Sequence, residues 1–146
     1  MRIIADTNLL VRLAVDDDPR QRRIAATAVT QAEAVIISRH ALCELVWVLR
    51  RSYKFTRTET AGAIQKLCGI KNVVLDNATV EAGLAVLAAG ADFADGVIVY
   101  EGRWLGGETF VSFDKKAVAA IAKQGMKTQL LGLELECAAD EVHECK

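Results

Sequence analysis

Short apolar runs alternate with longer amphipathic segments along this chain, and that alternation limits the possible folds more than any other feature. The apolar runs predict five short strands, at residues 2–5, 34–38, 72–76, 108–113 and 127–131. Continuous apolar strands separated by helices are typical of a parallel sheet that is covered on both faces. The sequence therefore predicts an α/β fold, a three-layer α/β/α sandwich with a short, mostly parallel four- to five-stranded sheet.

The helices expected between these strands carry recognisable start and stop signals. Pro19 suits the first turn of a helix that runs to about residue 31. Thr56 and Glu59 have the spacing of a capping box, and Gly69 would end the helix that this box begins. Further helices are expected near 9–15, 41–53, 78–89, 92–104 and 114–124.

The size and composition of the chain indicate one folded domain. It has 146 residues, of which 52% are hydrophobic, which is enough for a core of ordinary size. We expect one domain over residues 1–131 and an acidic C-terminal tail over residues 132–146. No apolar run reaches the length of a membrane span and no signal peptide is recognisable, so we expect a soluble, cytoplasmic protein.

Charge and cysteine content narrow the classes of function. The net charge of −1 does not favour nucleic acid as a partner, but the last 15 residues carry five acids and one lysine, so the remainder is net positive. Basic residues gather near 20–23 and 50–57, where a solvated helix face is the simpler explanation. The four cysteines form no C-x-x-C pair, so buried free thiols are expected and a zinc site is not.

Four aspartates lie at the ends of predicted elements. Asp6 follows the first strand and Asp114 follows the fourth, while Asp92 and Asp95 open the helix that precedes the fourth strand. In open α/β sheets the functional crevice lies at the carboxyl ends of the strands. Each aspartate also has a simple structural explanation as a helix cap or a first-turn acid.

Glu44 is harder to explain as a structural residue. It stands in the segment LCELVWVL, in which every neighbour from Leu42 to Leu49 is apolar. A lone carboxylate on a largely buried helix is costly unless its charge is compensated. We therefore favour a role for Glu44 in a functional site over a surface position or an arginine pairing.

Together these acids point to a metal site. Clustered carboxylates repel one another, and a hard divalent cation such as Mg²⁺ relieves that repulsion through oxygen ligands. Such a cation activates water and stabilises charge on phosphate. Neither His40 nor His143 has a plausible partner nucleophile, so a Ser-His-acid or Cys-His mechanism is not expected.

Four motifs then match a known family. The segments IIADTNLLVR, ALCELVWVL, GADFADGVIVYEG and TFVSFDKKA occur in this order along the predicted α/β chain. The chain resembles a PIN-domain ribonuclease of the kind found as the VapC toxin of toxin–antitoxin pairs, over residues 1–131. Position 96 departs from that pattern, because it is Gly96 where alanine or a similar small residue is more typical.

The resemblance implies the site residue by residue. Catalytic acids that also bind the metal would be Asp6, Glu44, Asp95 and Asp114, with Asp92 as an additional metal-site acid. Residues that orient these carboxylates would be Thr7, Asn8 and Ser112. Candidate phosphate contacts on RNA, proposed from their charge, are Arg50, Arg51, Lys54, Lys115 and Lys116. A tryptophan in the same region, Trp47, is expected in the core rather than stacked on a base.

The resemblance also implies an activity and partners. The activity would be that of a metal-dependent endoribonuclease, with Mg²⁺ or Mn²⁺ as cofactor, that hydrolyses phosphodiester bonds in RNA, with tRNA or rRNA as the expected substrate. The chain would be the toxin of a VapBC-type system, a homodimer that is inhibited by a cognate antitoxin protein.

Three alternatives remain at this stage. A haloacid-dehalogenase-like phosphatase needs a second acid two residues after Asp6, where this chain has Asn8. A response-regulator receiver domain could use Asp76 as its acceptor, but that interpretation leaves Glu44 and Asp95 unexplained. The third is a non-catalytic PIN-fold binding module, against which the four intact acids argue.

Overall fold

The structure, a computed structural model, describes residues 1–132 of the chain. The predicted acidic tail, apart from residue 132, lies outside the described residues, as do Cys137 and Cys145. The described residues form five strands, namely β1 (Arg2–Ile4), β2 (Ala34–Ile36), β3 (Val73–Val74), β4 (Thr109–Ser112) and β5 (Lys127–Leu130). The same part of the chain contains seven helices, namely α1 (Thr7–Ala14), α2 (Pro19–Gln31), α3 (Arg39–Arg51), α4 (Arg57–Cys68), α5 (Asn77–Ala88), α6 (Phe93–Trp104) and α7 (Lys115–Lys123).

The helices begin at the polar residues that the sequence indicated. Thr56 and Glu59 form the predicted capping box at α4, in which the Thr56 hydroxyl accepts the Glu59 N–H at 3.0 Å. Pro19 occupies the first turn of α2. Gly90 and Gly125 follow α5 and α7 with φ of 102° and 86°, a backbone conformation that side chains with a Cβ rarely adopt. Local capping chemistry therefore sets most of the element boundaries.

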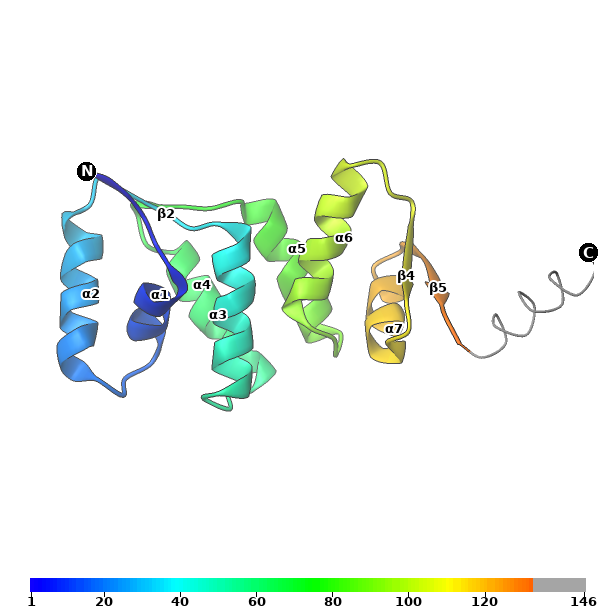
Figure 1. Cartoon of the computed structure of the whole chain (residues 1–146), viewed down its shortest axis with the longest axis horizontal. Coiled ribbons are helices and arrows are strands. Elements are labelled where there is room, and N and C mark those ends of the chain that lie inside the picture. Colours follow the sequence, from blue (N-terminus) through cyan, green and yellow to red (C-terminus); the bar gives the residue numbers. More distant parts are fainter. Residues whose placement is uncertain (133–146) are drawn as a thin grey trace, which may run out of the picture.

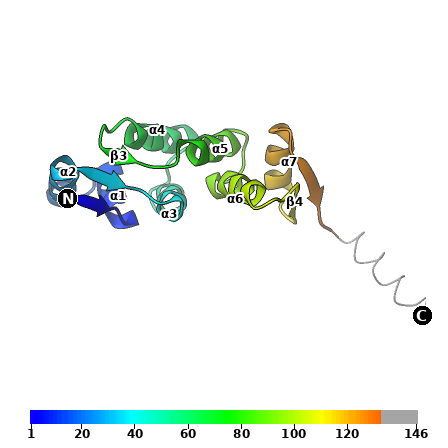
Figure 2. The ribbon, with the colours of Figure 1, turned by 90° about the horizontal axis from the view of Figure 1, so that it is seen from above.

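The strands pair in parallel but form two sheets. The first has the order β1-β2-β3, with Ile3 beside Val35, and the second consists of β4 and β5, with Ser112 beside Leu130. The predicted α/β class with parallel strands is confirmed. The five strands do not form the single expected sheet, because α5 and α6 lie between the two groups of strands (Figures 1 and 2).

Two separate apolar cores stabilise the part of the chain between residues 1 and 132. The larger core surrounds α3, whose Leu42, Leu45 and Leu49 are fully buried, and it receives Phe93 from α6. The smaller core joins Ala117, Ala120 and Ile121 of α7 to Val86 of α5. Each sheet is thus tied to α5 or α6 through its own apolar cluster.

Helices α5 and α6 cross at very short range. A Cβ at Gly96 would lie 2.3 Å from the backbone oxygen of Ala82, and one at Gly83 would lie 2.4 Å from the Phe93 ring. Both glycines are therefore required by close packing. They hold the N-terminal half of α6, which carries Asp95, against α5.

Two further expectations concern the burial of the cysteines and the presence of membrane-spanning helices. The predicted buried thiols are wrong in part, since Cys43 is half-buried and Cys68 is exposed. Within residues 1–132, none of the helices combines the length and the apolar character that a membrane span requires.

Candidate functional site

Asp6 and Asp114 occupy equivalent positions at the carboxyl ends of two strands. Each comes two residues after its strand and caps the helix that follows. Asp6 Oδ1 accepts the N–H of Leu9 at 3.0 Å, and Asp114 Oδ1 accepts the N–H of Lys116 at 2.9 Å. The Oδ2 atoms of both aspartates have no hydrogen-bond partner among the described residues. A capping role and a metal-binding role are therefore compatible, because each uses a different oxygen.

Glu44 projects from α3 into solvent. Its side chain is 51% exposed, so the expectation that it lies on a buried part of the helix is wrong. The Thr7 hydroxyl donates to Oε2 at 2.7 Å, and His40 Nε2 lies 2.6 Å from Oε1. These two hydrogen bonds, that from Thr7 first, lower the pKa of Glu44, while the negative charge of Asp6 opposes the shift. Glu44 is therefore a charged carboxylate beside Asp6 at neutral pH.

Asp95 has the opposite electrostatic environment. Burial raises its pKa above the ordinary value, and the charges of Asp92 and Asp114 raise it further. The backbone N–H of Asp92 donates to its Oδ2 at 3.3 Å and opposes the shift. Asp95 and Asp114 are thus electrostatic neighbours, and a cation between them would relieve their repulsion.

The acids fall into two pairs. Asp6 and Glu44 lie at the first sheet, whereas Asp95 and Asp114 lie at the start of α6 and the end of β4. Across residues 1–132, no three His, Cys, Asp or Glu side chains lie close enough to hold one metal ion. The structure therefore brings the predicted metal-site residues together two by two, and it does not bring all four into one cluster.

The residues predicted to orient the carboxylates behave differently from one another. Thr7 contacts Glu44 directly, as described above. Ser112 Oγ accepts the N–H of Asp114 at 3.0 Å, so it supports the backbone of that residue and not its carboxylate. Asn8 is exposed and makes no side-chain hydrogen bond within the described residues.

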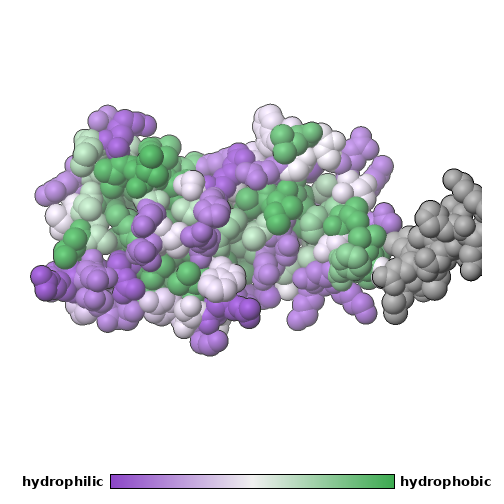
Figure 3. All heavy atoms as spheres, in the orientation of Figure 1, coloured by the Kyte–Doolittle hydropathy of each residue, from purple (hydrophilic) through white to green (hydrophobic). Residues whose placement is uncertain are grey.

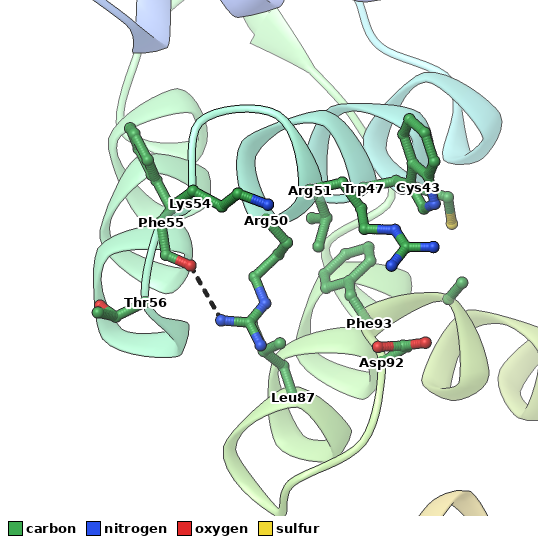
Figure 4. Close-up of a pocket in the computed structure, with 12 residues that line it drawn as sticks. Cys43, Trp47, Arg50, Arg51, Lys54, Phe55, Thr56, Leu87, Asp92 and Phe93 are labelled. Atoms are coloured by element: carbon green, nitrogen blue, oxygen red, sulfur yellow. Dashed lines mark hydrogen bonds between the residues drawn. The ribbon is translucent and has the colours of Figure 1, made fainter. Parts of the chain in front are cut away.

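A cleft of about 690 Å³ lies between the end of α3, the start of α4 and the start of α6 (Figure 4). Three of the predicted RNA contacts, Arg50, Arg51 and Lys54, line it together with Asp92. Trp47 also lines it and is 60% exposed, so the expectation of a core tryptophan is wrong.

The basic residues at this cleft are partly held in place. Arg50 Nη1 donates to the carbonyl of Phe55 at 2.9 Å, and the Arg51 guanidinium lies 5.9 Å from the centre of the Trp47 ring. The other two predicted contacts, Lys115 and Lys116, lie exposed at the start of α7, next to Asp114. The cations thus form two groups, one in the cleft and one beside an acid of the candidate site.

Two arginines that the sequence did not single out hold α5 and α6 in place through hydrogen bonds. Arg39 donates to Asp76 Oδ2 and to Glu101 Oε1, both at 2.7 Å, and so joins α3 to the start of α5 and to α6. Asp76 Oδ1 meanwhile caps α5. Both oxygens of Asp76 are thus occupied, which argues against a receiver-type phosphate acceptor.

The second missed arginine, Arg57, donates to three backbone carbonyls at and beyond the end of α5, those of Leu87, Gly90 and Ala91. No sequence signal marks either arginine as structural, since their partners are 30 or more residues away. The His40–Glu44 pair could have been found, because the two residues have the i,i+4 spacing of neighbours on a helix.

Comparison with protein-family models gives a match over most of the chain. The family model described as PIN domain matches residues 3–123, which include every acid of the two pairs. Among curated proteins, none matches the chain significantly.

Proposed function

The chain belongs to the PIN-domain family, whose members are typically nucleases, and we propose that it is a metal-dependent endoribonuclease that hydrolyses phosphodiester bonds in RNA. The observation that carries the proposal is the placement of its acids. Asp6 and Asp114 occupy matching positions at strand ends, and each has a carboxylate oxygen that no described residue binds. Glu44 and Asp95 each stand beside one of them.

The donor chemistry of these residues fits Mg²⁺ or Mn²⁺. Carboxylate oxygens are hard ligands, and Mg²⁺ is bound in proteins through one or two carboxylates while it keeps several waters. Each acid pair offers two carboxylates of this kind. The pairs would have to meet for all four acids to act in one site.

The residues of the candidate site would have different roles in hydrolysis. Asp6, Glu44, Asp95 and Asp114 would hold the metal, which when bound supplies an activated water and stabilises charge on the phosphate. Thr7 keeps Glu44 oriented and ionised through its 2.7 Å hydrogen bond. Asp92 adds a negative charge near Asp95 and lies at the edge of the cationic cleft.

The cleft supports binding of the RNA backbone. Arg50, Arg51 and Lys54 offer cations for phosphates, and the exposed ring of Trp47 offers a surface on which a base can stack. Lys115 and Lys116 would contact phosphates nearer the acids. Single-stranded RNA would follow a path from the cleft toward the start of α6.

We also propose the specific role that the sequence motifs suggested, that of a VapC-type toxin. Its substrate would be tRNA or rRNA, it would act as a homodimer, and a small antitoxin protein would inhibit it. A non-catalytic PIN-fold binding module is the alternative, and it predicts RNA binding without cleavage.

The test is to map RNA ends in cells that briefly express the protein. The variant Asp95→Asn removes one proposed ligand charge but keeps an oxygen that can accept the Asp92 N–H. A matched control is Asp16→Asn, because Asp16 is 72% exposed and pairs with Arg22 away from the site. We expect new 5′ ends with the wild type and the control, and none with Asp95→Asn. If all three proteins are soluble and produce the same pattern of RNA 5′ ends, the proposed nuclease activity is refuted.

A further inference from the structure

Each sheet of this protein presents an open edge. In the described residues β1 is the outer strand of the first sheet and pairs with β2 alone, while β4 pairs with β5 alone. The outward backbone groups of both strands therefore lack a ladder partner. Open edges of this kind are templates for pairing with another strand.

Large apolar side chains on and next to both edge strands are exposed. Ile4 of β1 is 82% exposed, Val111 of β4 is 47% exposed and Phe113, directly after β4, is 74% exposed. Exposed apolar groups at a strand that also lacks a neighbour indicate a surface that is covered in the working protein.

The two edge strands, β1 and β4, lie on the same long face of the molecule and run in the same direction. Figure 1 shows β1 and β4 near opposite ends of the face toward the viewer, both running downward, and Figure 2 places both strands on one side of the molecule. Figure 3 shows hydrophobic areas at both ends of this face, with hydrophilic surface between them. A twofold axis parallel to the strands, in front of this face, would set β1 of one copy beside β4 of another. That axis preserves strand direction, so both pairings would be parallel.

Such pairing has a natural register. Asp6 follows the last residue of β1 by two positions, and Asp114 follows the last residue of β4 by two positions. With Ile4 beside Ser112, the two aspartates come side by side on strands about 4.8 Å apart. Glu44 accompanies Asp6 and Asp95 accompanies Asp114, so the two acid pairs would merge into one cluster.

The same register covers the exposed side chains. Side chains of paired residues in a parallel ladder lie on one face of the sheet. Val111 would share the face of Ile3, which packs on the larger core, and Ile4 would share the side of β4 on which Phe110 packs on the smaller core. Each copy would thus extend its helical layer over the apolar residues that the other exposes.

Pairing of β1 with β4 of the same chain would cost more free energy than pairing of these strands between two copies. The β4–β5 unit is fixed by Ala117, Ala120 and Ile121, which are almost fully buried against α5. For β4 to reach β1 of its own chain, that core would have to open. A second copy can supply β4 with both cores intact.

We propose that two copies of this chain pair β1 of each with β4 of the other, and that each nuclease site consists of Asp6 and Glu44 from one copy and Asp95 and Asp114 from the other. This inference rests on the proposed function for the chemistry of the site. It adds to that function a specific partner, a second copy, without which the site is incomplete.

Complementation between two inactive variants tests the proposal. One chain carries Asp6→Asn with Glu44→Gln, the other carries Asp95→Asn with Asp114→Asn, and different affinity tags isolate only mixed dimers. In a mixed dimer with exchanged strands, one site has all four native acids and the other has none. We expect about half the wild-type ribonuclease activity per dimer, since one of two symmetric sites is intact, and no activity from either variant alone. Mixed dimers without activity, or the absence of mixed dimers, would overturn the proposal of a site shared between two copies. Ribonuclease activity of the wild type would in that case still support the proposed function.

Sedimentation in Mg²⁺ buffer provides a test that does not depend on activity. We expect the wild type to sediment at twice its chain mass of 15.8 kDa. Ile4→Glu and Phe113→Glu each place a charge at the proposed interface and should yield monomers with an unchanged circular dichroism spectrum. The matched control is Ile24→Glu on α2, because Ile24 is 61% exposed and belongs to neither of the two paired strands, and it should stay dimeric. A monomeric wild type, or folded dimers of both interface variants, would refute strand exchange.

Discussion

Substitution of Gly96 by alanine tests the close crossing of α5 and α6. The added Cβ would lie 2.3 Å from the oxygen and 2.8 Å from the carbonyl carbon of Ala82. Because both neighbours are backbone atoms, no side-chain rotation relieves the clash, and the helices would have to separate by about 1 Å to restore ordinary contact.

The magnitude follows from two opposing terms. Replacing glycine by alanine inside a helix stabilises it by about 1 kcal/mol. Overpacking in a close contact costs about 1–3 kcal/mol, and a backbone neighbour places Gly96→Ala toward the upper end. We expect a net loss of about 1–2 kcal/mol in the free energy of unfolding.

Gly102 on the same helix provides the control. A Cβ there would meet no atom within 4 Å, so Gly102→Ala should gain up to about 1 kcal/mol from helix propensity alone. Urea denaturation followed by circular dichroism should separate the two midpoints by roughly 1 M. Equal midpoints for the two variants, or a more stable Gly96→Ala protein, would refute the claim that this contact sets the position of α6.

Three further predictions concern two residues of the candidate site and one structural arginine. Thr7→Val removes the hydrogen bond that contributes most to the low pKa of Glu44, so that pKa should rise in an NMR titration. The low pKa of Glu44 stabilises the folded protein above the unfolded pKa of this group. That stability, and the proposed binding of Mg²⁺ by the Glu44 anion, should then be lost at a higher pH as the solution is acidified. Asp114→Asn removes a negative charge and should lower the pKa of Asp95 in the same titration, whereas an unchanged value would contradict their proximity. Arg57→Met leaves three carbonyls at the end of α5 without their charged donor and should cost about 2 kcal/mol in urea unfolding.

Sequence patterns predicted the local structure of this chain well because its signals are local. Pro19 and the Thr56–Glu59 box act within one turn, and the structure uses them as expected. The aspartates at strand ends were placed correctly as helix caps for the same reason. The separation of the two sheets depends on how α5 and α6 pack against α7 and α3. That packing brings together residues far apart in the chain, such as Val86 with Ile121 and Phe93 with Leu42.

The environment of individual site residues was harder to predict. The apolar neighbours of Glu44 suggested burial, but α3 turns Leu42, Leu45 and Val46 inward and Glu44 outward. Trp47 was expected in the core for its size and instead lines the cleft. A hydrophobic pattern predicts which face of a helix is buried. The exposure of one residue depends on which other elements pack against it.

The double use of Asp6 and Asp114, as helix caps and as proposed metal ligands, has an evolutionary consequence. Asparagine caps a helix about as well as aspartate, so a change from Asp to Asn at either position would remove a carboxylate charge and leave the helix start intact. An aspartate codon becomes an asparagine codon by one nucleotide change. Under the proposed function, a gene of this kind would lose catalysis in one mutational step while its product stayed folded and kept its binding surfaces, and selection could then act on binding alone.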